Sequence, residues 1–127
     1  MKMKKKMEKL TKKEEEIMQI IWQLERCTVS DILDVIERAE GKRPPHSSIA
    51  TVVQILEKDR RFLDYKAFGK TYEYFPIVSK EDYGKRSLSK LVSDYFEGSA
   101  HNLVSFLVKE EKMNADELKK LLDMLDE

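Results

Sequence analysis

The chain has 127 residues, 41% hydrophobic and 38% charged, and its 24 Lys and Arg balance its 24 Asp and Glu. This length predicts one domain or two small ones, and the zero net charge excludes a protein that is basic along its whole length. No apolar run approaches the roughly 20 residues of a membrane helix. The single Cys27 excludes an internal disulfide and a zinc site with several cysteines. We therefore expect a cytoplasmic protein without direct membrane contact.

The charges are distributed unevenly along the chain. Residues 1–78 contain 16 Lys and Arg against 13 Asp and Glu, whereas residues 79–127 contain 8 against 11. This asymmetry favours a polyanionic partner for the first part. Seven of the positive charges lie within the first thirteen residues, which is also typical of a solvated tail.

Three amphipathic helices are predicted in the first part, at about residues 11–24, 28–41 and 46–58. Thr11 and Glu14 have the spacing of a capping box at the start of the first helix. In all three segments apolar residues recur every three or four positions, so each helix has one face to bury.

A β-hairpin is predicted next. Residues 62–68 and 72–77 are rich in aromatic and β-branched residues, and Gly69 favours a turn between them. We expect the aromatic residues of the second strand to belong to the core rather than to stack on bases: Tyr72, Tyr74 and Phe75.

Residues 79–127 are predicted to form three further helices, each with one apolar face. Helices this short form a thin core by themselves, so a second copy of the chain would bury their remaining apolar faces. We therefore expect residues 79–127 to be a helical dimerisation domain. The predicted dimer interface consists of the apolar positions Leu88, Leu91, Val92, Tyr95, Phe96, Leu103, Phe106, Leu107, Leu118, Leu121, Leu122 and Leu125.

Three helices followed by a hairpin is the order of a winged helix-turn-helix. In that fold the third helix enters the DNA major groove and the hairpin, or wing, lies beside the backbone. The predicted fold class is therefore mainly α with a small β-hairpin wing. A winged helix-turn-helix domain over residues 8–78 is followed by the three-helix dimerisation region over residues 79–127.

Five segments of the chain resemble the penicillinase-repressor family. They are LTxxExxIMxxIW at 10–22, TVSDI at 28–32, SIATVVxxLEK at 48–58, KAFGKTYEYFP at 66–76 and ELxxLLxxL at 117–125. The resemblance runs from about residue 8 to the C-terminus. It implies a transcriptional repressor that binds an operator dyad as a homodimer, without a cofactor. It also implies release by proteolysis, with a membrane-bound sensor metalloprotease as a further partner, or release by another signal.

The resemblance directs attention to the face of the third helix opposite its apolar stripe. Ser47, Thr51 and Gln54 are the predicted base contacts, because Gln can bond adenine and the Thr methyl can pack on thymine. His46 and Ser48 are predicted to hold phosphate near the helix N-terminus. The other predicted backbone contacts are Lys12, Lys13, Lys42, Arg43, Lys58, Lys66, Lys70 and Thr71.

The chain departs from the family at two positions of this helix, since the better-known repressors have basic residues where it has Ala50 and Ile55. For each predicted Lys or Arg contact, ordinary solvated charge is the alternative. Neither the phosphate-binding Gly loop, the nucleophile elbow nor the HExxH pattern is present, so we expect no enzyme and no metal site. Cys27 fits a small apolar residue better than a redox or metal sensor. The alternative function is a winged helix that binds another protein instead of DNA.

Overall fold

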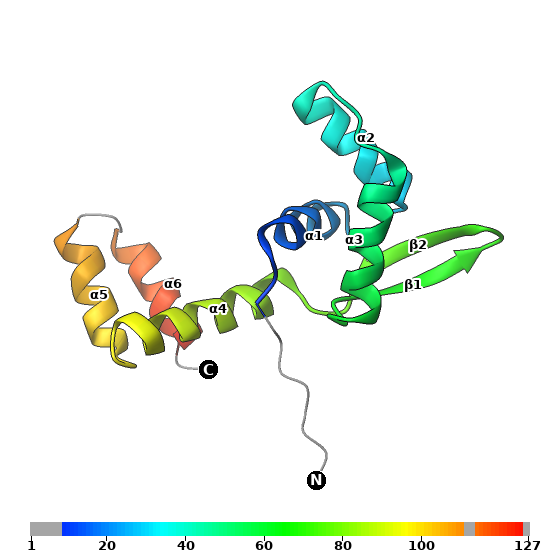
Figure 1. Cartoon of the computed structure of the whole chain (residues 1–127). Coiled ribbons are helices and arrows are strands. Elements are labelled where there is room, and N and C mark those ends of the chain that lie inside the picture. Colours follow the sequence, from blue (N-terminus) through cyan, green and yellow to red (C-terminus); the bar gives the residue numbers. More distant parts are fainter. Residues whose placement is uncertain (1–8, 111–113, 126–127) are drawn as a thin grey trace, which may run out of the picture. The chain divides into compact units, whose positions relative to one another are not determined.

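The computed structural model describes residues 9–110 and 114–125. The chain divides into two compact units, the first ending at Lys80 and the second beginning at Glu81. The element order in Figure 1 is α1 (Lys12–Leu24), α2 (Val29–Glu40), α3 (His46–Lys58), β1 (Leu63–Phe68), β2 (Thr71–Pro76), α4 (Lys80–Tyr95), α5 (Ala100–Lys109) and α6 (Ala115–Leu125). Three helices, an antiparallel hairpin and further helices confirm the predicted fold class.

The start of α1 is fixed by Glu14, which has two roles. The amide of Glu14 donates to Thr11 Oγ1 at 3.1 Å, and the amide of Thr11 donates back to Glu14 Oε1 at 3.0 Å, so the predicted capping box is confirmed. The same Glu14 oxygen accepts from Arg60 Nε at 3.1 Å. Because Glu14 is buried, this ion pair joins the beginning of α1 to the segment that follows α3.

The turn between α2 and α3 is defined by its two ends. Gly41 caps α2 with φ +77°, a left-handed conformation that glycine adopts without steric cost. Pro45 is the N-cap of α3 and offers no side-chain hydrogen bond. The helix-turn-helix connection is therefore the segment 41–45.

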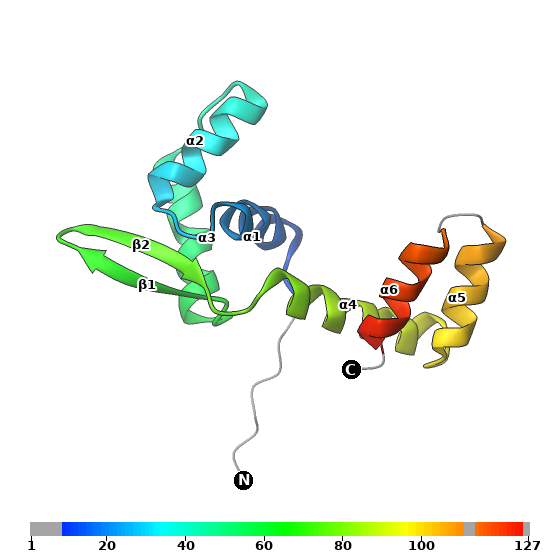
Figure 2. The ribbon, with the colours of Figure 1, turned by 180° about the vertical axis from the view of Figure 1, so that it is seen from behind.

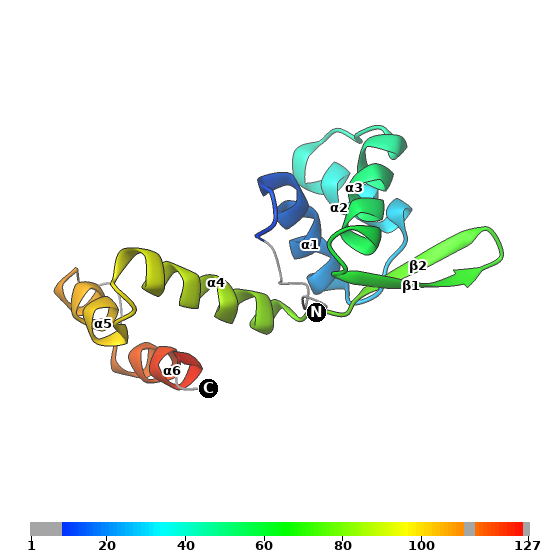
Figure 3. The ribbon, with the colours of Figure 1, turned by 60° about the horizontal axis from the view of Figure 1, so that its bottom comes forward.

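The core of the first unit lies between the three helices and the base of the hairpin. The apolar helix faces predicted from the spacing are buried there, together with Phe62 and Leu63 at the start of the hairpin. The fully enclosed side chains include Ile17, Met18, Ile21, Ile32, Leu33, Ile49, Val53, Leu56, Phe62 and Leu63. Figure 3 shows the hairpin projecting away from these helices.

The hairpin, called the wing below, turns at Gly69 with φ +63°. Its base is attached to the segment between α1 and α2. The amide of Cys27 donates to the Tyr74 carbonyl at 3.0 Å, and the amide of Tyr74 donates to the Cys27 carbonyl at 2.7 Å. Burial raises the pKa of the Cys27 thiol to about 12, so the thiol stays neutral among apolar neighbours, as the apolar interpretation of Cys27 expects.

The expectation that the aromatic residues of β2 all belong to the core is wrong for Tyr72. Tyr74 is buried and Phe75 half-buried, but Tyr72 is 45% exposed. The reason is the length of the wing. The turn end of the hairpin extends past the helices, as Figure 2 shows from behind. Side chains near that end therefore have few core residues to pack against.

The segment after the wing is held by two bonds from the first unit. Trp22 Nε1 donates to the Val78 carbonyl at 2.9 Å, and the amide of Ile77 donates to the Phe62 carbonyl at 2.8 Å. The half-buried indole of Trp22 thereby fixes the chain just before α4 begins.

The second unit contains few buried side chains. Val92 and Leu103, both predicted for the dimer interface, are already buried within the single chain and have almost no surface left for a partner. Leu91, Tyr95 and Phe106 are exposed instead. Leu88, Phe96, Leu107 and Leu118 are half-buried. The side chains of Leu121, Leu122 and Leu125 lie outside the described part of the structure. Within residues 9–110 and 114–125, no helix combines the length and the apolar character needed to cross a membrane.

The ion pair between the buried Glu14 and the half-buried Arg60 yields a stability prediction. Replacing Glu14 with Ala removes the capping box and leaves Arg60 without this carboxylate. The free energy of unfolding should fall by about 3 kcal/mol, because a lost cap and a broken buried ion pair add together. Urea unfolding followed by circular dichroism measures this loss. The matched variant Glu16→Ala, at an exposed position of the same helix, should change stability by no more than about 0.5 kcal/mol. Equal effects of the two variants would contradict the prediction.

Candidate nucleic-acid interface

A groove of 320 Å³ lies between α3, the start of α2 and the wing. Its lining is Thr28, Val29, Ser30, His46, Ala50, Gln54, Lys70, Thr71, Tyr72 and Tyr74. None of these ten residues is acidic, although 24 of the 127 residues of the chain are Asp or Glu. The lining thus combines one permanent cation with hydroxyl and amide groups, a chemistry that suits an anionic ligand.

Four of the predicted DNA contacts are brought together in this groove. His46 and Gln54 come from α3, and Lys70 and Thr71 come from the turn and second strand of the wing. The other predicted residues of α3 are exposed but do not line the groove: Ser47, Ser48, Thr51 and Lys58. Lys12, Lys13 and Lys42 are also exposed and lie outside its lining.

Lys66 lies on the other face of the wing. It is paired with Glu73 across the hairpin, whereas Tyr72 and Tyr74 belong to the alternate positions that line the groove. Lys66 is therefore not among the residues that line the groove.

Hydrogen bonding distinguishes the three predicted base contacts. Thr51 Oγ1 donates to the carbonyl of Ser47 at 2.8 Å, so its proton is used within the helix and its methyl remains exposed. Among the described residues, the side-chain amide of Gln54 has no hydrogen-bond partner. Gln54 therefore keeps the adjacent donor and acceptor that a base edge requires.

The N-terminus of α3 has backbone donors to offer. The amide of Ser48 bonds to the Pro45 carbonyl at 3.2 Å. The amides of His46 and Ser47 have no acceptor within the part of the chain that the structure describes. The N-terminal end of a helix also has a positive partial charge, so this end of α3 favours a phosphate group.

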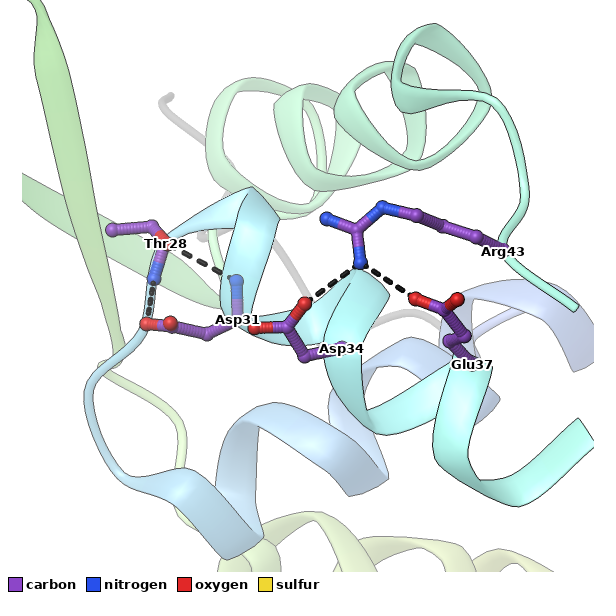
Figure 4. A network of polar contacts seen from close by, with 5 residues as sticks. All are labelled: Thr28, Asp31, Asp34, Glu37 and Arg43. Carbon is purple, nitrogen blue, oxygen red and sulfur yellow. Dashed lines mark hydrogen bonds and ion pairs between the residues drawn. The ribbon is translucent and has the colours of Figure 1, made fainter. Parts of the chain in front are cut away.

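Three of the four carboxylates of α2 are occupied by local partners (Figure 4). Arg43 Nη1 contacts Asp34 Oδ1 at 2.7 Å and Glu37 Oε1 at 3.0 Å. The hydrogen bonds that Arg43 donates to these two carboxylates hold its pKa above its ordinary value. Asp31 Oδ2 accepts the amide of Thr28 at 2.9 Å in a second capping box. Arg43 therefore ties the turn to α2, and its charge is shared with two acidic groups.

Six residues of the groove were not predicted as contacts, namely Thr28, Val29, Ser30, Ala50, Tyr72 and Tyr74. Thr28 and Ser30 line it because the first turn of α2 faces the wing. The Thr28 and Asp31 spacing is a sequence signal for that helix start. Strand alternation could have identified Tyr72, because it lies on the same face of β2 as Tyr74, which lines the groove.

Comparison with known proteins agrees with this architecture. The family model of the penicillinase repressor matches residues 10–127. The chain therefore belongs to the penicillinase repressor family, and the family inferred from the sequence motifs is confirmed. Membership places it among transcriptional repressors, which are regulatory proteins and not enzymes.

Curated relatives cover nearly the same length. The methicillin resistance regulatory proteins MecI of Staphylococcus aureus (strain N315), Staphylococcus epidermidis and Mammaliicoccus sciuri are each 25% identical to the chain over 111 residues. These residues span 87% of this chain and 88% of each relative.

Proposed function

We propose that the chain binds an operator dyad in double-stranded DNA as a homodimer and represses transcription from the cytoplasm. The observation that supports this most strongly is the groove without carboxylates between α3 and the wing. It gathers His46, Gln54 and Lys70 from two separate elements. Phosphate contacts dominate the affinity of such complexes, and a surface free of acidic groups avoids repelling them.

The proposed docking follows from the two sides of the groove. α3 enters the major groove, where the Gln54 amide bonds an adenine edge and the Thr51 methyl packs against a thymine methyl. The free amides at the start of α3 hold a phosphate, with His46 and Ser48 beside them. Lys70 and Thr71 at the wing contact the neighbouring backbone. Lys12, Lys13, Lys42 and Lys58 add long-range attraction.

Dimerisation through the second unit supplies the second binding site. Leu91, Tyr95 and Phe106 are exposed there, which is costly for a unit that buries so little of itself. A two-fold pairing covers these side chains and presents two copies of α3 to half-sites one or more helical turns apart. Linkage of the copies raises the effective concentration of the second at the DNA.

Release is proposed to act on the same pairing. Proteolytic cutting of α5 near Phe106 and Leu107 would separate the two winged helices, and a membrane-bound sensor metalloprotease is the proposed agent. The Asn-Phe pair usual at the cleavage site in the β-lactam branch of the family is absent at this point, so the scissile bond is not assigned. A signal that loosens the dimer without cutting it would have the same consequence.

The alternative is a winged helix that binds a protein. The uncharged Ala50 and half-buried Ile55 on α3 favour it, since they reduce the positive charge available for phosphate. A gel-shift titration with duplexes selected from a random pool separates the two functions. A repressor retains one dyad and loses affinity steeply with salt, whereas a protein-binding module selects no duplex.

Two groove variants should affect DNA binding in different ways. Gln54→Ala should reduce discrimination at one base pair by about 1–3 kcal/mol, because it removes a contact to a base edge. Lys70→Ala should weaken all duplexes alike and reduce the slope of log affinity against log salt by about 1 for each half-site. Titration of both variants against the selected dyad and its single-base mismatches measures these effects. Wild-type behaviour in both would contradict the assigned contacts.

Arg43 should behave differently from Lys70. Since Asp34 and Glu37 hold its guanidinium, Arg43→Gln should leave the salt slope unchanged. Asp34→Asn combined with Glu37→Gln should strengthen DNA binding, because it removes two negative charges and frees Arg43. Adding Arg43→Gln to that double variant should cancel part of the gain. A slope reduced by about 1 in Arg43→Gln alone would instead make Arg43 a phosphate contact.

The dimer can be tested at Tyr95, which is 75% exposed on α4. Tyr95→Glu should give a monomer in analytical ultracentrifugation, because the new charge would be buried at the interface. Affinity for the dyad should fall by about a hundredfold as linkage is lost, which imitates proteolytic release. Ser93→Glu adds the same charge at an exposed polar position of α4 and should remain dimeric. A dimeric Tyr95→Glu variant would place the interface elsewhere.

A further inference from the structure

Three tyrosines occupy one face of the wing. Tyr65 is paired with Tyr74 across the hairpin, and Tyr72 lies two positions before Tyr74, so strand alternation directs all three rings to the same side. The rings of Tyr65 and Tyr72 are stacked, with centroids 4.4 Å apart and planes inclined by 15°. Tyr74 completes the group at 5.8 Å from Tyr65 and 6.4 Å from Tyr72. The wing therefore has a continuous aromatic face.

This face extends from the core to the solvent. Tyr74 is buried and is fixed by its two main-chain bonds to Cys27. Tyr65 and Tyr72 are 37% and 45% exposed. The inner ring thus supports the outer pair, and stacking limits the rotation of Tyr72. A side chain already held in one conformation loses little entropy when it binds a ligand.

The two exposed rings differ in what they face. Tyr72 lines the groove beside Lys70 and Thr71, whereas Tyr65 is absent from the lining. Within residues 9–110 and 114–125, neither tyrosine hydroxyl has a hydrogen-bond partner. The Tyr72 hydroxyl is therefore an available donor at the edge of a groove without carboxylates.

We propose that Tyr72 is a contact to the DNA sugar–phosphate backbone, with Tyr65 and Tyr74 as the residues that position it. Its hydroxyl donates to a phosphate oxygen, and its ring packs against the adjoining deoxyribose. This contact rests on the proposed function, since it requires α3 to occupy the major groove. It differs from the Lys70 contact in that a neutral donor binds phosphate without adding a cation.

A purely structural role for the stack makes a different prediction. An isolated two-stranded hairpin is only marginally stable, so the stacked rings alone could serve to stiffen the wing. Tyr72→Phe separates the two roles, because it keeps the ring and removes only the hydroxyl. Tyr65→Phe is the matched control: it removes the same group from the stacked partner, which does not line the groove.

The test uses the full-length chain and the dyad selected by the wild-type protein, with binding followed by fluorescence anisotropy over a range of salt concentrations. Tyr72→Phe should bind about tenfold more weakly, as expected for a lost hydrogen bond to a charged group. Its salt slope should equal that of the wild type, since no cation is lost. Tyr65→Phe should bind like the wild type. Wild-type affinity in Tyr72→Phe would overturn the proposal, and equal losses in both variants would assign the hydroxyls to wing structure.

A second measurement locates the contact on the DNA. Single phosphates of the dyad are replaced by methylphosphonates, and the wild type and Tyr72→Phe are titrated against each duplex. One position should weaken the wild type while leaving Tyr72→Phe little affected, because both changes remove the same contact. Independent effects at every position would overturn the proposal even if Tyr72→Phe binds weakly. If the wild type selects no duplex, the proposed function itself is wrong. That result differs from a failure of the Tyr72 contact alone, in which the wild type still selects a dyad.

Discussion

Two main-chain hydrogen bonds between Cys27 and Tyr74 determine where the wing lies relative to the helices of the first unit. They attach β2 to the segment that joins α1 and α2. The groove depends on this attachment, because one of its sides is the wing and another is the start of α2. An apolar, uncharged residue suits position 27, since a thiolate there would be buried beside backbone groups that are already paired. Burial disfavours the charged thiolate and is the main reason that the pKa of the thiol is raised to about 12.

The electrostatic character of the groove arises from local pairing, since the chain as a whole is neutral. The carboxylates of Asp31, Asp34 and Glu37 are bonded to the Thr28 amide or to Arg43. Glu14 is buried against Arg60 on another side of the same unit. A strongly charged sequence thus forms a groove whose lining contains no acidic residue. Arg43 is engaged in the same pairing, so in the proposed complex polar and aromatic groups would contribute a larger part of the binding.

The sequence predicted those features that depend on neighbouring residues. The capping box of Thr11 and Glu14, the buried helix faces and the turn at Gly69 follow from local spacing, and the structure has them all. Features set by the tertiary arrangement were not predictable in the same way. The ion pairs of Arg43 with Asp34 and Glu37 could not be predicted before the position of α2 relative to Arg43 was known. Tyr72 looks like a core residue until the length of the wing is known. Val92 and Leu103 have the helical spacing of interface residues but are buried within one chain.

The two units have different roles in the proposed binding of DNA. The first unit encloses a well-formed core and has its proposed contacts on rigid elements, so a single copy can present the groove intact. The second unit exposes Leu91, Tyr95 and Phe106, so its own stability increases when a partner covers them. In the proposed dimer, DNA affinity and the stability of the second unit would depend on the same pairing of chains. A signal that acts only on the second unit can therefore reduce operator occupancy without altering any group that touches DNA.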